Sequence, residues 1–416
     1  MSDAEGSKRD IDTVFLRILA RGNSSRFKFL PPPDDPVGKV IESIAAEILA
    51  FCQTTSDAEL SERVNPRRIS VRMVPLGDVS ALTLYMGSSH IIAFNQGVAL
   101  YLYRLARAMT PYVIVRGAGD DPPPPESEAV AVIAVLLDWM SSLVRAPLVD
   151  AWETGPREQR TAENYARMAE RFVLSHEIAH IMRGHLVGDA GTAPQKSSSL
   201  HDLDRRPVVQ EHEADAIGAM LAVDSSSAAG IDPRAAVAGV RYFFEALKLC
   251  EAVGAVHIDD AHRPAVERSA LCDQVMSGRY GRVPNLHQAA DQTSDLLRRL
   301  GSAALEERQR RRVIVAARME ELLTNTSWHF GSNDPAVMRS IFDEAKSMFA
   351  SSPSAVIDAL QATLLDTQTF ERLMRTAKSP EALEQDDRLR RHRIAHFIAR
   401  NAPLPVRDAL GVGFPY

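Results

Sequence analysis

Residues 171–186 read RFVLSHEIAHIMRGHL and place two histidines, His176 and His180, four positions apart. Apolar residues surround them at helical spacing, which predicts a helix. At about 100° per residue, side chains four positions apart leave the same face of a helix one turn apart. Glu177 follows the first histidine directly and projects to one side of the pair. The spacing therefore predicts two imidazole ligands for one metal ion, with a carboxylate beside them that can act as a base.

The spacing alone does not decide the matter, because two hydrogen-bonded histidines in a buried helix would have the same spacing. A catalytic zinc usually has three protein ligands, so a third ligand is needed. The segment EHEAD begins at Glu211, 31 residues after His180. On a second helix packed antiparallel to the first, Glu211 would face the metal. Asp215, on the same face, could accept a hydrogen bond from the far nitrogen of a liganding histidine. Glu213 lies about 200° around the helix from Glu211 and is not expected to face the metal. The alternative for this segment is a solvated acidic turn.

Three other histidines are interpreted as structural. His185 follows His176 by nine residues, which on a continuous helix rotates it about 180° from the ligand face, so a structural or capping role is expected. His392 and His396 are also four apart, but the sequence has no glutamate directly after the first and no third ligand nearby. We interpret them as ordinary helix residues.

Together, SHEIAH and EHEAD resemble the gluzincin metallopeptidases, and within them the M48 family, in which HExxH is followed by ExxxD on the next helix. The resemblance implies a Zn²⁺ ion held by His176, His180 and Glu211, and a protein or peptide as the substrate. It also implies that Glu177 takes a proton from an activated water and passes it to the departing amine. The function it implies is zinc-dependent hydrolysis of peptide bonds.

Two flanking segments extend this resemblance to about residues 37–275. Downstream, AHRPAVERSAL offers His262 and Arg268 at the spacing of the family's His-Pro segment, with Arg263 where the family usually has proline. By resemblance, both are candidates for stabilising charge on the carbonyl oxygen, His262 as a catalytic residue and Arg268 in support of the ligands. Upstream, SHIIAFN (89–95) looks like the family's edge strand, which receives an extended peptide through main-chain hydrogen bonds.

The periodicity along the chain predicts an α+β fold that is predominantly helical. A helix over 37–52 precedes three short β-rich runs, RISVRMVP, SALTLYM and HIIAFN, and PYVIV (111–115) is a further candidate strand. From about Thr161 the pattern is almost wholly helical. We expect a flexible tail, a small α/β part with the substrate-edge strand, a helical zinc-site part and an all-helical C-terminal region, at residues 1–36, 37–150, 151–280 and 281–416.

Composition and charge narrow the class of partner. The chain has 416 residues, of which 45% are hydrophobic and 25% charged, and its formal net charge is −6. This small charge predicts no general attraction to nucleic acid or anionic lipid. Each of two clusters, 308–312 and 388–393, contains four arginines, but acidic residues precede both within one or two turns. We interpret the clusters as solvated helix faces and expect no nucleic-acid partner.

The sequence also predicts a cytoplasmic location. The N-terminus lacks the basic start and apolar run of a secretory signal. The longest apolar run, residues 129–137, falls short of the ~20 residues that span a bilayer, so we expect a buried helix there and no integral membrane segment. Three widely spaced cysteines without CxxC spacing fit a reducing compartment and a role in core packing.

Two alternatives to an M48-like peptidase stay open from the sequence. One is a peptidase of the U49 type, whose members act in bacterial defence or exclusion and cleave a host translation factor; the motif HEIAH supports this resemblance. The other is a non-catalytic protein that keeps a gluzincin fold as an interaction module, with the C-terminal helices as its working surface. Loss of Glu177 or of a ligand would favour the second, and all of these residues are present.

Overall fold

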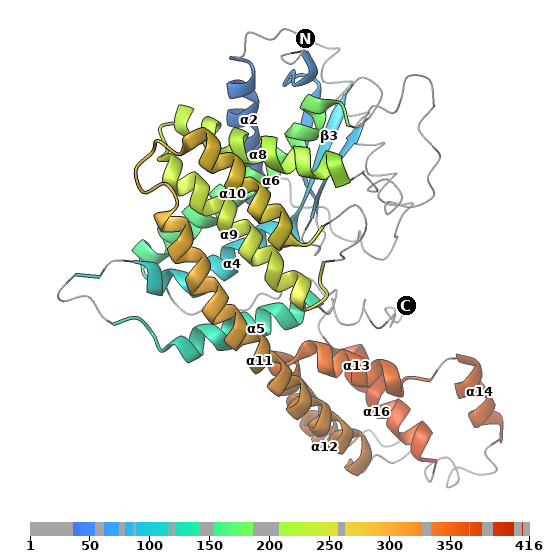
Figure 1. Ribbon diagram of the computed structural model, residues 1–416. Coiled ribbons are helices and arrows are strands. Elements are labelled where there is room, and N and C mark those ends of the chain that lie inside the picture. The colour runs from blue at the N-terminus through green and yellow to red at the C-terminus, as the bar shows by residue number, and fades with distance from the viewer. Residues whose placement is uncertain are drawn as a thin grey trace. The chain divides into compact units, whose positions relative to one another are not determined.

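The computed structural model describes residues 36–54, 62–74, 80–85, 89–114, 116–117, 122–141, 154–185, 208–256, 263–326, 334–365, 367–376, 386–402 and 410 (Figure 1). Over these residues the chain is predominantly helical with a three-stranded sheet near its N-terminal end, which confirms the predicted fold class. The chain divides into unit 1, which comprises Met1–Pro125 and Val149–Leu300, and unit 2, which comprises Glu126–Leu148 and Gly301–Tyr416. The four segments expected from the sequence remain a prediction, and the expected tail lies outside the described residues except for Pro36.

The sheet of unit 1 contains the three strands that the β-rich runs predict. β3 (His90–Asn95) pairs in parallel with β1 (Ile69–Val74) and antiparallel with β2 (Ala81–Tyr85). β3 is therefore the central strand, and the prediction that it forms an edge open to a peptide is wrong. Its backbone is hydrogen-bonded on both sides, and its residues from Ile91 to Asn95 are buried. The uninterrupted apolar run IIAF is typical of a strand that is covered on both faces.

The prediction of a strand at PYVIV is wrong for its first three residues, which form the last turn of helix α4 (Gln96–Val113). Pro111 lacks the backbone donor that would bond the carbonyl of Arg107, and the hydroxyl of Thr110 donates to that carbonyl instead, at 3.3 Å. The helix then ends at Val113, and the backbone of the next residue, Ile114, is extended. Side-chain packing of this partly buried last turn outweighs the strand propensity of its aromatic and β-branched residues.

Helix α6 is the central helix of unit 1 and is buried on all sides from Met168 to Ile181. A helix that is covered all around needs no polar face, which explains the mixed pattern of RFVLSHEIAHI. Its neighbours are α2, α4, α8 and α9, and α10 packs against α8 and α9. The bounds of the helices not yet given are α2 (Pro36–Cys52), α6 (Pro156–Arg183), α8 (Val208–Ala228), α9 (Pro233–Ala252) and α10 (Ala265–Tyr280).

Unit 2 is helical in its described residues, and its α5 (Glu126–Ser141) is the buried apolar helix that the sequence predicts. Asp138 interrupts the apolar run of α5 and accepts hydrogen bonds from Ser352 and Ser354, where another helix begins. Arg308 pairs with the same carboxylate at 3.1 Å, so this buried charge is compensated within unit 2. The other helices with residues in unit 2 are α11 (Gln288–Asn325), which contains the unit boundary, α12 (Pro335–Ser351), α13 (Pro353–Thr363), α14 (Thr367–Thr376) and α16 (Asp387–Asn401).

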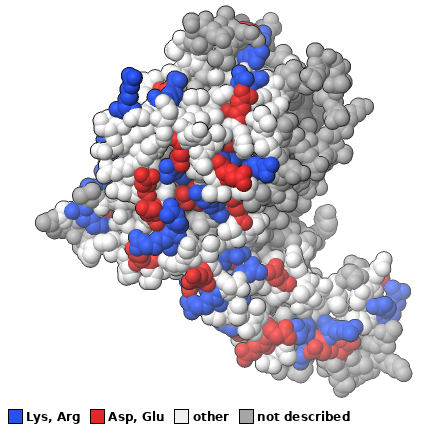
Figure 2. Space-filling view, in the orientation of Figure 1, with Lys and Arg blue, Asp and Glu red and all other residues white. Residues whose placement is uncertain are grey.

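The arginine clusters lie on helix faces and pair with carboxylates. Arg310 and Arg311 both pair with Glu307 on α11, and Arg391 of α16 pairs with Glu320 at 2.7 Å. On the face shown in Figure 2, basic and acidic side chains are interspersed. These pairs agree with solvated helix faces, while the absence of a nucleic-acid partner stays a prediction. No helix in the described part of the chain is long and apolar enough to cross a bilayer.

Candidate metal centre

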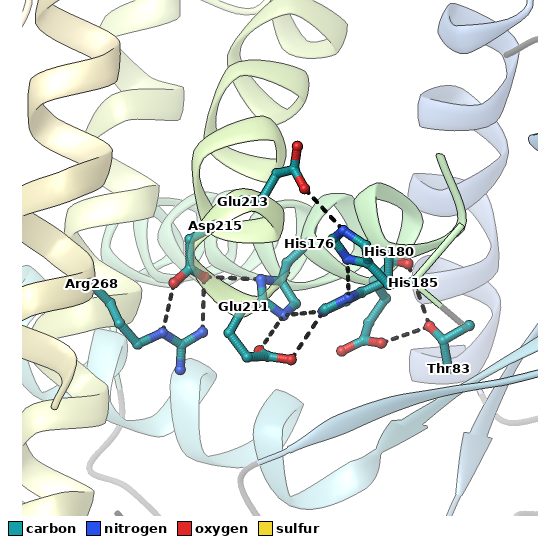
Figure 3. A network of polar contacts seen from close by, with 9 residues as sticks. Thr83, His176, His180, His185, Glu211, Glu213, Asp215 and Arg268 are labelled. Carbon is teal, nitrogen blue, oxygen red and sulfur yellow. Dashed lines mark hydrogen bonds and ion pairs between the residues drawn. The ribbon is translucent and has the colours of Figure 1, made fainter. Parts of the chain in front are cut away.

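His176 and His180 of α6 converge with Glu211 of α8 on one point (Figure 3). The Nε2 atoms of the two histidines lie 3.2 Å apart, and each lies 3.3 Å from a different carboxylate oxygen of Glu211. One potential ligand atom from each residue lies within 4.8 Å of the others, and all three residues are buried. Within the described residues, this is a buried His-His-Glu group that could hold a metal ion.

The close approach of α8 to α6 depends on Gly218. A Cβ atom at this position would lie 2.8 Å from the Cα of His176 and 2.9 Å from its backbone nitrogen, closer than real Cβ contacts. Gly218 follows Glu211 by seven residues, so the two lie on one face of α8. The glycine therefore allows α8 to place its carboxylate against the two imidazoles.

Asp215 lies between His176 and Arg268 in Figure 3. The Nδ1 atom of His176 is 2.9 Å from one Asp215 oxygen, and Arg268 of α10 donates to both Asp215 oxygens at 2.7 and 2.8 Å. This bidentate pair fixes the plane of the carboxylate, which in turn fixes the imidazole ring of His176. The structure therefore brings Asp215 into the contact that the sequence predicts and places Arg268 behind it.

The charges of this cluster shift the pKa values of its members. Burial opposes the ionised form of Asp215, but the charge and hydrogen bonds of Arg268 outweigh it and lower the pKa to about 2. Burial likewise opposes protonation of His176, yet hydrogen bonds to Asp215 and Glu211 raise its pKa to about 10. When no metal is bound, these shifts favour a protonated His176 between the two carboxylates. A dication would displace this proton and supply the positive charge in its place.

Glu177 extends from α6 to the sheet, where it contacts Thr83 of β2. The Thr83 hydroxyl donates to the Oε2 atom of Glu177 at 2.6 Å, and both side chains are buried. Sequence reasoning did not find Thr83, because a single threonine in a β-rich run carries no motif. The contact fixes the orientation of the carboxylate that the sequence predicts to be the base.

His185 also contacts the site, which the helical-wheel argument did not predict. α6 ends at Arg183 and is followed by Gly184, whose φ of 70° is left-handed. The backbone N–H of His185 donates to the carbonyl of His180 at 3.1 Å. This C-terminal turn folds His185 back, so that its Nδ1 lies 3.0 Å from the Nδ1 of His180. Its Nε2 lies 3.0 Å from Glu213. The glycine directly before His185 was the available signal that the helical rotation stops there.

The remaining residues proposed from the sequence differ in their outcome. His262 lies outside the described residues, so its catalytic role stays a prediction. Arg268 directs both of its contacts named above to Asp215, which agrees with support of the ligands. The third cysteine of the chain, Cys272, is buried next to Asp215, with its Sγ atom 3.5 Å from the backbone carbonyl of that residue.

Comparison with known proteins adds no relative. No protein-family model matches the chain, and no curated protein or solved structure is detectably similar to it. The case for a function therefore depends on the residues of the site.

Proposed function

We propose that this protein is a zinc-dependent metalloendopeptidase of the gluzincin type. The observation that carries the proposal is the convergence of His176, His180 and Glu211, with Glu177 next to the first ligand along the chain. A protein or peptide is the proposed substrate and the cytoplasm the proposed location. The M48-like resemblance of the two motifs supports this substrate class.

The donor set fits zinc. Two imidazoles and one carboxylate are one of the protein ligand sets of catalytic zinc sites, which keep one position open for water or substrate. The set contains no thiolate, as copper(I) and iron–sulfur sites would favour, and it has too few oxygen donors for calcium. The Nδ1 atoms of both histidines contact other residues of the protein, and both Nε2 atoms point toward Glu211. This arrangement directs one nitrogen of each ring toward a common point, where an ion could bind.

In the proposed mechanism each residue has a distinct task. A bound zinc ion supplies Lewis acidity, which lowers the pKa of water and polarises a carbonyl group. The carboxylate of Glu177 accepts a proton from the attacking water and later delivers it to the departing amine nitrogen. Thr83 holds one oxygen of this carboxylate during both transfers. Asp215 keeps the His176 ring in the tautomer that leaves Nε2 for the metal.

The decisive experiment compares wild-type protein with Glu177→Gln for zinc content and for cleavage of an unfolded, fluorescently labelled protein pool. We expect about one zinc per chain in both, and a rate about 10²–10⁴-fold lower in the variant because the general base is lost. Glu163→Gln is the matched control, since Glu163 is an exposed glutamate of the same helix, and it should cleave at the wild-type rate. Loss of zinc in Glu177→Gln would make Glu177 a ligand instead. Zinc-loaded wild-type protein that cleaves nothing would favour the interaction module.

A further inference from the structure

His180 has an unusual second contact for a proposed metal ligand, namely another imidazole. His176 meets a carboxylate directly through Nδ1, whereas His180 meets the Nδ1 atom of His185 at 3.0 Å. His185 in turn lies 3.0 Å from Glu213, whose other oxygen pairs with Arg183 at 2.5 Å. In Figure 3 these contacts continue from the His-His-Glu group toward Glu213.

Two facing Nδ1 atoms admit a hydrogen bond only if one carries the proton and the other does not. If His180 gives its Nε2 lone pair to a metal, its neutral ring must carry the proton on Nδ1 and donate it to His185. His185 must then carry its own proton on Nε2, where the carboxylate of Glu213 accepts it. The protons of the two rings are thus assigned by a single consistent network that ends on a carboxylate.

We infer that His185 is a positioning residue for the metal, which fixes the ring and tautomer of His180 and transmits the orientation set by Glu213. This inference rests on the proposed zinc site. In this role His185 contacts neither the metal nor the substrate. It acts through its contact with His180. Its side chain is only 7% exposed, so water competes little for the Nδ1 of His180.

The backbone turn at the end of α6 makes this contact possible. Gly184 takes up the left-handed conformation, and Arg63 donates to the carbonyl of Met182 at 3.1 Å, so the turn is fixed from two sides. His185 follows His180 by five residues in the sequence, and the turn brings the two side chains next to each other. Glu213 comes from α8, the helix that also supplies Glu211, so both helices contribute to the orientation of His180.

The test measures zinc affinity by competition with a chelator for wild type, His185→Ala and His185→Asn. We expect His185→Ala to weaken zinc binding about 10–100-fold, the usual effect of losing a partner of a metal ligand. His185→Asn should bind nearly as well as wild type, because its Oδ1 takes the place of the imidazole Nδ1 and accepts the proton of His180. His212→Ala is the matched control, since His212 neighbours Glu211 in sequence but is not part of this network, and it should leave the affinity unchanged.

Two further readouts separate positioning from a merely structural role. The visible spectrum of the Co²⁺-substituted protein should change in His185→Ala and return in His185→Asn, because it reports the geometry of the ligands. Melting temperatures in excess chelator should be the same for all variants. An unchanged zinc affinity in His185→Ala would overturn the inference, as would an equal loss in His185→Asn. A wild-type protein that binds no zinc would overturn the proposed function as well, whereas zinc binding without cleavage would leave this test intact.

Discussion

Two histidine pairs share the same four-residue spacing on helices of this protein and differ in what surrounds them. The rings of His176 and His180 lie between the carboxylates of Glu211 and Asp215 and a further imidazole. In unit 2, the Nδ1 of His392 accepts a hydrogen bond from the backbone of Leu365, and its ring lies 5.0 Å from that of Phe370.

The surroundings shift the pKa of His176 in one direction and the pKa values of His392 and His396 in the other. Carboxylates raise the pKa of His176 to about 10 in spite of burial. Burial lowers the pKa of both His392 and His396, and the charge of a neighbouring residue lowers each further. Two histidines four positions apart on a helix therefore do not by themselves make a candidate metal site. Acceptor atoms from a second helix make the difference, because they compensate the charge of an ion that the histidines alone would hold poorly.

The largest effect should come from removing one ligand. His180→Ala and Glu211→Ala should each weaken zinc binding more than about 100-fold, beyond the range seen for residues behind the ligands. Metal analysis after dialysis against dilute chelator would measure this. His392→Ala and His396→Ala are the controls with the same spacing and should retain about one zinc per chain. Zinc loss from either control, with retention in Glu211→Ala, would move the site to unit 2 and break the comparison.

The sequence predicted the His-His-Glu group that could hold a metal ion because the information needed for it is local. Spacing on α6 and on α8 determines which side chains share a face, so His176, His180, Glu211 and Asp215 could be chosen before any tertiary contact was known. Thr83 could not, because its contact with Glu177 joins residues 94 positions apart and depends on how the sheet packs on α6.

The errors at the sheet and at the end of α6 have physical causes. Alternation and propensity predict that a run is a strand, but not which strand lies in the centre, so β3 was placed wrongly at an edge. His185 was assigned by continuing a helix past Gly184, although glycine commonly ends helices in a left-handed turn. In both cases the missing information was the path of the chain after a regular element.

An ion pair between Asp215 and Arg268 lies behind His176. Asp215→Ala should lower the free energy of unfolding by ~3–5 kcal/mol, because the partly buried Arg268 keeps its charge without its carboxylate partner. Urea unfolding in excess chelator would measure this without a contribution from zinc. The same variant should bind zinc about 10–100-fold more weakly, because His176 loses its orienting acceptor.

A double variant distinguishes these two consequences. Asp215→Ala combined with Arg268→Met removes both charges and should recover much of the stability while zinc binding stays weak. Recovery of zinc affinity along with stability would show that Asp215 serves the fold alone. It would also remove one of the differences that set the two histidine pairs apart.

The smallest expected effect is that of burial on the pKa of Glu170, an acid on α6. Burial raises the pKa of Glu170 from 4.5 to about 7, although the charge of Arg167 opposes this shift. The folded state thus binds the proton of Glu170 more tightly than the unfolded state does. The stability that this proton contributes is complete below about pH 4.5 and is lost as the pH rises through about 7. Glu170→Gln should therefore add up to ~3 kcal/mol of stability at about pH 8 and almost nothing near pH 4.5.

The measurement is chelator-treated urea unfolding of wild type and Glu170→Gln across this pH range. Titration of His176 is common to both proteins and cancels in the difference. Glu163→Gln, an exposed site on the same helix, should give a difference that does not change with pH. A flat difference for Glu170→Gln would mean that Glu170 is compensated like Asp215. Burial would then account for less of the contrast between the two histidine pairs, and the carboxylates of α8 for more.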